Sequence, residues 1–327
     1  MKENNKPFIL CAWNFDGHGG GKDIKDSELS DVIKSKDLSW VHIDANNPEA
    51  REWLKREVNY LDDLILDALL DSETRPRMLE FNDGILMILR GVNLNYGADQ
   101  EDMLSVRLWV DQHRIISLEF RNVSIVHDIL RNLKMGRGPK DSGDFIAALS
   151  AQLLKLMDPV LITLNEDTDN IEEQIIENPN YDERDIIVTI RKKAIVFRRH
   201  MLPQREVIQN LSLVDLPWLN KMHKRQIQEG YNHVQRYIED LDSIRERTQI
   251  IKDELTNALS NRMNKKLYVL SLVASIFLPL SFLTGLMGVN IGGIPGATND
   301  KAFLIFTAGL LVLISFQFWL FKKLKWL

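Results

Sequence analysis

The sequence is poor in cysteine and lacks the motifs of several enzyme classes. Its 327 residues include one cysteine, Cys11, which excludes an intramolecular disulfide framework and fits a reducing compartment. No P-loop and no nucleophile–base arrangement occur, so we expect a protein that is not an enzyme and holds no permanent cofactor. The formal net charge of -5 argues against a nucleic-acid partner and favours the attraction of cations.

The N-terminus also lacks a secretion signal. Residues 1–7 are polar, and no apolar segment with a small-residue cleavage site follows them. We therefore expect the large N-terminal part of the chain to stay in the cytoplasm.

Charged residues are absent from two long stretches near the C-terminus. Residues 267–287 (LYVLSLVASIFLPLSFLTGLM) and 302–321 (AFLIFTAGLLVLISFQFWLF) contain no Asp, Glu, Lys, Arg or His. Each is long enough to cross a bilayer as a helix. The short glycine-rich loop 288–301 between them predicts a hairpin of transmembrane helices. A pair of buried helices in a soluble protein is the alternative, which the flanking lysines disfavour.

The lysines at the ends of these stretches predict the topology. Lys265 and Lys266 precede the first span, and a basic tail, 322–327, follows the second. By the positive-inside rule both ends lie in the cytoplasm and only the loop lies outside. We expect a multi-pass protein of the inner, or plasma, membrane.

Residues 1–140 have the pattern of a mixed α/β domain. We expect strands at 8–13 and 40–45, and hairpins turning at Asn82-Asp83-Gly84 and at Asp111-Gln112-His113. Helices are predicted at 48–60 and 123–134.

From residue 144 onward the strand signals vanish and long helices are expected. They cover 145–177, 181–211 with a kink at Pro203, and 217–287, the last about 105 Å long. The predicted fold class is an α+β cytoplasmic domain followed by long stalk helices, 144–266, and a two-helix transmembrane hairpin at the C-terminus. A helix this long cannot bury its apolar surface by itself, so its length predicts oligomerisation.

The first span carries a stripe of small and polar residues at spacings of three and four. We call it the α-stripe: Asn264, Leu267, Ser271, Ala274, Leu278, Ser281, Gly285 and Gly288. Such a stripe is typical of close helix packing, or of a water-filled path enclosed by several copies of the helix. Pro279 frees the carbonyl of Ser275, which makes a kink or a hinge.

The tripeptide Gly288-Val289-Asn290 closes the first span. Gly288 allows close backbone approach, and Asn290 can present a carboxamide oxygen to an axis between copies. A ring of such oxygens can hydrogen-bond the water shell of a divalent cation without stripping it. Alone the tripeptide is a weak signal, but its place after a long helix and before a second span makes it a strong one.

With these features together, the whole chain resembles the CorA superfamily of two-span metal-ion transporters. The resemblance implies a homopentamer in the lipid bilayer, with a cytoplasmic funnel and a pore made of five first spans. It also implies a role for each matched position: Asn264 at the inner end, Leu267 and Leu278 as apolar constrictions, Ser281 as a polar ring, and Gly288 with Asn290 at the outer entrance.

The motif and loop resemble the ZntB zinc-transporter branch in particular. The motif here is GVN, and the loop has no acid before Asp300, unlike the magnesium-transporting members. The resemblance implies Zn²⁺ as the transported ion, moved together with protons. A magnesium, cobalt or nickel channel is the alternative within the family, and a membrane-anchored cytoplasmic binding or signalling module is the alternative outside it.

Four further sets of charged or ionisable residues bear on function. Lys265 and Lys266 would form a basic collar, as topology anchors or as an electrostatic gate. Asp253 matches a position that senses cytoplasmic ion in magnesium-type members, although its partner cannot be located. The acids from Glu166 to Asp185 fit a solvated helical tip or a cation-attracting wall. The 7 histidines show no ligand spacing, so each is predicted to be structural or to lie at the surface rather than to be a ligand.

Overall fold

The computed structural model describes residues 8–25, 28–58, 60–71, 75–180, 182–289, 291, 294, 296 and 299–324. Asn290 and the last part of the basic tail, 325–327, lie outside these residues. The chain forms two compact units. The first comprises residues 1–178 and 182–252, and the second comprises 179–181 and 253–327.

The first unit is built on one mixed sheet. In the described residues its strands are ordered β2-β1-β3-β7-β6-β5-β4. Only β3 and β7 run parallel, and every other neighbouring pair is antiparallel. The strands are β1 (Ile9–Phe15), β2 (Gly21–Asp23), β3 (Ser39–Asp44), β4 (Arg77–Phe81), β5 (Gly84–Gly91), β6 (Leu104–Val110) and β7 (Arg114–Glu119).

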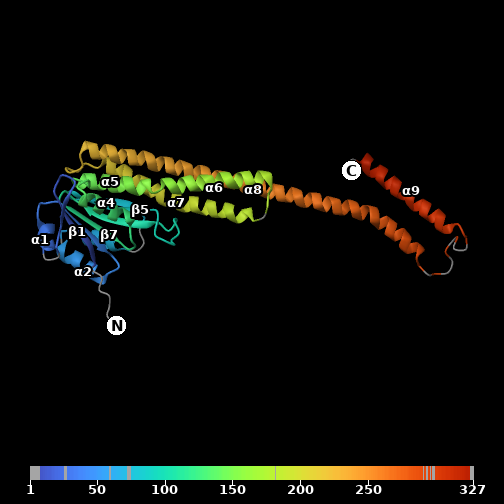
Figure 1. Cartoon of the computed structure of the whole chain (residues 1–327), viewed down its shortest axis with the longest axis horizontal. Helices are drawn as coiled ribbons and strands as arrows, with labels where there is room; N and C mark the ends of the chain where they lie inside the picture. The colour runs from blue at the N-terminus through green and yellow to red at the C-terminus, as the bar shows by residue number, and fades with distance from the viewer. Residues whose placement is uncertain are drawn as a thin grey trace, which may run out of the picture. The chain divides into compact units, whose positions relative to one another are not determined.

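Helices cover both faces of this sheet, so its central strands contribute residues to two cores (Figure 1). Ile85, Met87 and Leu89 of β5 face the core shared with the long helices, while Leu86 faces the other. The helices of the second core are α1 (Leu29–Lys34), α2 (Pro48–Glu57) and α3 (Asp63–Leu70). The first core is covered by α4 (Ser124–Lys134), α5 (Ser142–Lys155), α7 (Glu183–Leu213) and the start of α8 (Lys221–Met287).

Both predicted hairpins are present. β4 and β5 pair from Arg77↔Ile88 to Phe81↔Gly84, and Asn82 in the turn has a φ of 51°. Asn is one of the residues that tolerate this left-handed conformation, which explains the turn signal. The second hairpin joins β6 to β7, with Val110 paired to Ile115.

The structure corrects three predictions about elements. The helix expected at 145–177 is two helices, α5 and α6 (Asp158–Glu177), because Pro159 lies in the first turn of α6 and has no N–H to continue α5. The short helices α1 and α3 and the strand β2 were not predicted. The helix expected at 217–287 begins at Lys221, capped by the Asn220 side chain.

Long helices run side by side within the first unit (Figure 1). Arg247 of α8 binds Asp169 and Glu172 of α6, and Arg198 of α7 lies 2.6 Å from Asp242 of α8. Part of the acidic segment between Glu166 and Asp185 is therefore neutralised within the chain. Pro203 lies inside α7, which continues through it, and its neighbour Gln204 accepts a hydrogen bond from the Arg90 backbone N–H in β5.

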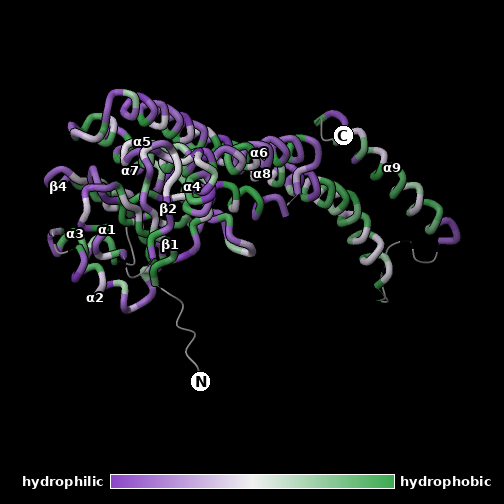
Figure 2. The backbone as a smooth tube through the Cα atoms, turned by 60° about the vertical axis from the view of Figure 1, so that its left-hand side comes forward, coloured by the Kyte–Doolittle hydropathy of each residue, from purple (hydrophilic) through white to green (hydrophobic). Residues whose placement is uncertain are grey.

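The second unit contains the last part of α8 and the helix α9 (Ala302–Lys323). Figure 2 shows the apolar character of both segments. By length and composition, three described helical stretches could cross a membrane: Ser142–Glu177, Lys221–Met287 and Ala302–Lys323. The apolar window of the first is 56% buried, against 0% and 6% for the others. Since it packs inside the first unit, we assign the spans to the other two.

Candidate functional site

The α-stripe lies on a face of α8 that α9 does not cover. Its members from Asn264 to Gly288 are all exposed. The half-buried residues of this part of α8 repeat at a spacing of three or four on another face: Leu272, Ile276, Pro279, Leu280 and Leu283. Packing within the chain therefore uses the apolar face and leaves the small and polar face open.

The matching face of α9 carries a polar residue that sequence reasoning missed. Half-buried residues of α9 again repeat at three or four, and they include Phe306, Leu310, Leu313 and Gln317. Gln317 Nε2 lies 3.5 Å from the Ser275 carbonyl oxygen, the group that Pro279 leaves without its helical donor. The signal in the sequence was a carboxamide in the middle of an otherwise apolar span.

The hydroxyl groups of α8 fall into two sets. Ser275 Oγ donates to Ser271 O at 2.8 Å, and Thr284 Oγ1 donates to Leu280 O at 2.9 Å. These hydroxyls are satisfied by their own helix, as is usual in membrane spans. Within the described residues, the side chains of Ser271 and Ser281, both on the α-stripe, make no hydrogen bond. They can bind water or a hydrated ion.

The apolar and charged positions of the predicted pathway are also exposed in the single chain. Leu267 is 53% and Leu278 is 74% exposed, one above the other along the stripe. Asn264, Lys265, Lys266 and Asp253 are exposed on the same helix. The structure thus brings these residues onto one helix without closing a path, because a single stripe cannot enclose one.

At its C-terminal end, α8 stops at Met287 and Gly288 begins the loop. Its N–H lies 3.0 Å from Thr284 O, and a Cβ added to it would lie 3.2 Å from the same oxygen. A mainly apolar pocket of about 600 Å³ lies beside it, lined by Met287, Phe303 and Phe306 among others. The predicted entrance residue, Asn290, lies outside the described residues.

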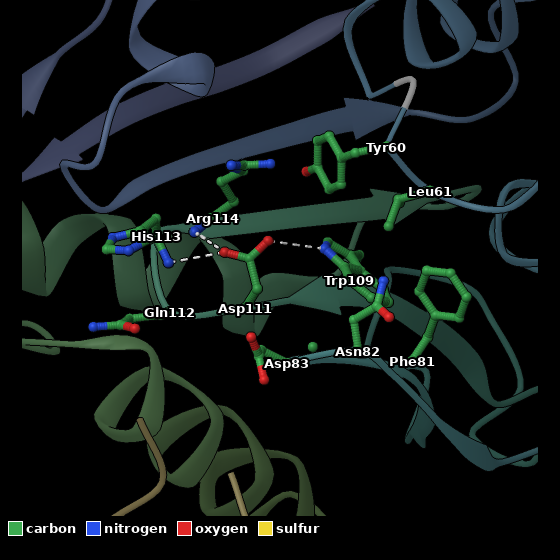
Figure 3. Close-up of a pocket in the computed structure, with 11 residues that line it drawn as sticks. Tyr60, Leu61, Phe81, Asn82, Asp83, Trp109, Asp111, Gln112, His113 and Arg114 are labelled. Carbon is green, nitrogen blue, oxygen red and sulfur yellow. Dashed lines mark hydrogen bonds between the residues drawn. The ribbon is translucent and has the colours of Figure 1, made fainter. Parts of the chain in front are cut away.

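Two polar regions of the first unit are explained by internal contacts. In Figure 3, Asp111 accepts hydrogen bonds from Trp109 Nε1 and from the backbone N–H groups of His113 and Arg114, beside a pocket of about 330 Å³. The Arg114 guanidinium lies 4.2 Å from the centre of the Tyr60 ring. The Asp111 carboxylate is therefore held by contacts within the two strands and their turn.

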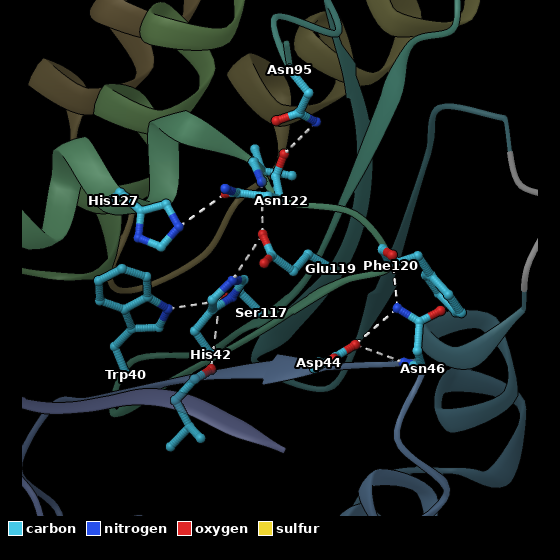
Figure 4. A network of polar contacts seen from close by, with 12 residues as sticks. Trp40, His42, Asp44, Asn46, Asn95, Ser117, Glu119, Phe120, Asn122 and His127 are labelled. Atoms are coloured by element: carbon cyan, nitrogen blue, oxygen red, sulfur yellow. Dashed lines mark hydrogen bonds and ion pairs between the residues drawn. The ribbon is translucent and has the colours of Figure 1, made fainter. Parts of the chain in front are cut away.

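Figure 4 shows the second region, around the buried His42. Its Nδ1 lies 2.8 Å from Ser117 Oγ, and its Nε2 lies 3.2 Å from Glu119, which also accepts the Val123 N–H. The same Ser117 hydroxyl accepts from Trp40 Nε1. As predicted, this histidine is structural. His223 is different, because the structure brings it to Asp141 and Asp144, a group that no short sequence spacing signals.

Comparison with known proteins agrees with these features. Residues 35–323 match the family described as CorA-like Mg2+ transporter protein. The chain is 36% identical to the "Zinc transport protein ZntB" of Pectobacterium carotovorum subsp. carotovorum, over 100% of this chain and 98% of that protein. It is 34% identical to the "Divalent cation transporter CmaX" of Pseudomonas aeruginosa, over 98% of this chain and 97% of that protein.

Solved structures give the same result. The full-length CmaX protein has a TM-score of 0.84 at 31% identity, covering 99% of this chain and 100% of that one. The CorA magnesium transporter of Methanocaldococcus jannaschii, at 17% identity and a TM-score of 0.80, covers 97% of this chain and 99% of that one, and shares the fold. The family consists of transporters and not of enzymes. This chain belongs to the CorA-like family of divalent-cation transporters.

Proposed function

We propose that this protein moves Zn²⁺ across the bilayer through an axial pore formed by five copies of the chain. The observation that carries the proposal is the α-stripe, which stays exposed on the face of α8 that α9 leaves open. Lipid does not favour unsatisfied hydroxyl and carboxamide groups, whereas facing copies can enclose them around water. The names of the full-length relatives support zinc as the ion.

Each residue of the pathway takes a role in this proposal. The pathway runs between Asn290 beside Gly288 at the outer end and Asn264 at the inner end, and ions pass Ser281 with their hydration shell. Leu278 and Leu267 make apolar constrictions that can close by excluding water. Because the pathway holds neither His nor Cys, it binds zinc weakly, as fast passage requires.

Charges outside the spans support the orientation. Lys265 and Lys266 precede one span, and Lys322 and Lys323 end the other. We therefore propose that the protein lies in the inner membrane with both termini in the cytoplasm. The two lysines of α8 would form the collar below the pore, and Asp253 would be a sensor position on the same helix. Neither span contains Asp, Glu, Lys, Arg or His, so any proton coupled to zinc is proposed to travel through water or through groups outside the bilayer.

A magnesium, cobalt or nickel channel is the second candidate, because the description of the matching family names Mg²⁺. A passive membrane anchor for a cytoplasmic module is the third. The anchor would tolerate changes on the α-stripe, and the two channel candidates would not.

Metal flux into liposomes that hold the purified protein and a metal-sensitive dye separates these candidates. We expect zinc influx that a proton gradient increases and that Asn290→Ala or Ser281→Leu removes. Thr284→Val is the matched control, since its hydroxyl is bonded within its own helix. Magnesium influx without gradient dependence would favour the second candidate. A folded oligomer without flux of any metal would overturn the transport proposal.

A further inference from the structure

Two carboxylates and a histidine of the first unit meet where α5 and α8 begin. Asp141 is the N-cap of α5 and accepts the Asp144 N–H at 2.8 Å. Asp144 lies in the first turn of α5, and His223 lies in the first turn of α8. His223 is 3% exposed, while the two carboxylates are partly open to solvent.

The distances match those of ligands around a metal ion. His223 Nε2 lies 3.1 Å from Asp144 Oδ1 and 3.4 Å from Asp141 Oδ1. Tetrahedral zinc with bonds of about 2.0–2.2 Å holds its ligand atoms about 3.3 Å apart. The histidine nitrogen is therefore at a ligand spacing from each carboxylate oxygen, and the potential ligand atoms of the three residues all lie within 4.8 Å of one another.

The surrounding residues hold the imidazole in this place. A Cβ on Gly143 would lie 1.9 Å from His223 Nδ1, so the ring fills the space that a side chain would take. Asn220 caps α8, with its Oδ1 accepting the N–H groups of Met222 and His223. Ser142 Oγ donates to the Asp111 carbonyl at 2.6 Å and fixes the start of α5. Such supporting contacts orient metal ligands in known sites.

The charge of the site favours an added cation. Asn220 places its backbone nitrogen 3.4 Å from His223 Nδ1 and its Nδ2 3.3 Å from Nε2. Two nitrogen atoms of Asn220 therefore lie against the ring and help to hold it in place. Within the described ranges, no lysine or arginine side chain forms an ion pair with Asp141 or Asp144. Among the described residues, the ion-pair partner of the two carboxylates is therefore the His223 ring alone.

We propose that Asp141, Asp144 and His223 bind a divalent transition-metal cation, with Zn²⁺ as the first probe. Mixed imidazole and carboxylate ligands suit such a cation better than Mg²⁺, which prefers oxygen and keeps its waters. Binding would join the start of α5 to the start of α8. This site is separate from the proposed pore and does not depend on it.

Zinc binding to the full-length protein in detergent tests the site directly. Equilibrium dialysis would measure bound Zn²⁺ per chain, and the visible absorption of added Co²⁺ would report its ligand geometry. We expect His223→Gln and the isosteric Asp144→Asn to lose one bound ion per chain, or to weaken its binding at least about tenfold. His233→Gln is the control, because that half-buried histidine lies on the same helix and its ion-pair partner is Glu229.

Circular dichroism of each variant confirms that it is folded before binding is compared. Unchanged stoichiometry and affinity in both folded variants would overturn the proposed site. The result is independent of transport: zinc bound at this site in a protein that shows no flux in liposomes would contradict the pore and still support the site.

Discussion

At the scale of single residues, Gly143 is the position where an added methyl group has least room. Its Cβ would lie 1.9 Å from His223 Nδ1, and the imidazole is buried and cannot move aside freely. We expect Gly143→Ala to destabilise the first unit by about 1–3 kcal/mol, the usual cost of overpacking. Thermal unfolding followed by circular dichroism measures this change.

Gly230→Ala is the matched control for that substitution. Gly230 lies inside α8, and the nearest atom to its added Cβ is the end of the Leu154 side chain at 3.3 Å. Since alanine is favoured over glycine in a helix by about 1 kcal/mol, this variant should be as stable as the wild type or more so. Equal destabilisation of both variants would contradict the close packing of His223 against Gly143.

A second residue makes stability depend on pH. Burial, and then the charges of Arg90, Arg199 and Arg75, lower the pKa of His200 to about 4 from its usual 6.5. Between these values the unfolded chain binds a proton that the folded chain does not, so stability is complete above about 6.5 and falls as the pH drops towards 4.

We expect His200→Gln to reduce this loss of stability in acid. Allowing for the partial exposure of the ring, the effect is about 1 kcal/mol, or roughly 2–4 °C in melting temperature for a unit of this size. The measurement is the melting temperature of wild type and variant at pH 7 and pH 5. His127→Gln, at an exposed histidine, should keep the acid sensitivity of the wild type.

At the scale of elements, the pairing of α8 with α9 depends on a proline and a glutamine. Pro279 leaves the Ser275 carbonyl without a helical donor, and Gln317 Nε2 approaches it at 3.5 Å. Gln317→Leu should destabilise the hairpin by about 0.6 kcal/mol, typical of hydrogen bonds between membrane helices. In a Pro279→Ala background, where the carbonyl regains its donor, the same change should cost less. Melting temperatures of the four proteins in detergent complete this cycle, and additive effects would rule out the coupling.

The elements themselves were predictable where a strong local signal exists. Strand alternation and the Asn82-Asp83-Gly84 turn located the hairpins, and the charge-free stretches located both spans. The break at Pro159 was missed because the apolar spacing continues across it. The short helices α1 and α3 give too few turns for a periodic pattern.

The two candidate sites also differ in how far the sequence predicts them. The α-stripe follows from helical spacing alone, since all its members lie on one helix. The group of Asp141, Asp144 and His223 joins helices that begin about 80 residues apart, and only the packing of α8 onto the first unit brings them together. The aspartates also serve as ordinary N-terminal helix residues, so nothing in their local sequence indicates a ligand.

At the scale of the whole molecule, the single chain leaves the apolar surfaces of its two spans uncovered. The apolar windows of the two spans are 0% and 6% buried, so lipid or other chains must cover them. Lipid suits Leu270 and Phe282, but it does not suit the free hydroxyls of Ser271 and Ser281. Only association of several copies gives both faces of α8 a fitting environment, which is why transport and oligomerisation are proposed together.

Cysteine substitution distinguishes this assembly from a passive anchor. Ser281→Cys would place a thiol in the water-filled axis, where a charged, water-soluble thiol reagent should reach it and block metal flux in liposomes. Phe282→Cys, its neighbour facing lipid, should be modified much more slowly, because the reagent needs a hydrated thiolate. The native Cys11 should react very slowly with the reagent, since burial raises its pKa to about 12. Equal reaction at both positions would mean that α8 has no side facing water, and the pore would have to be abandoned in favour of the anchor.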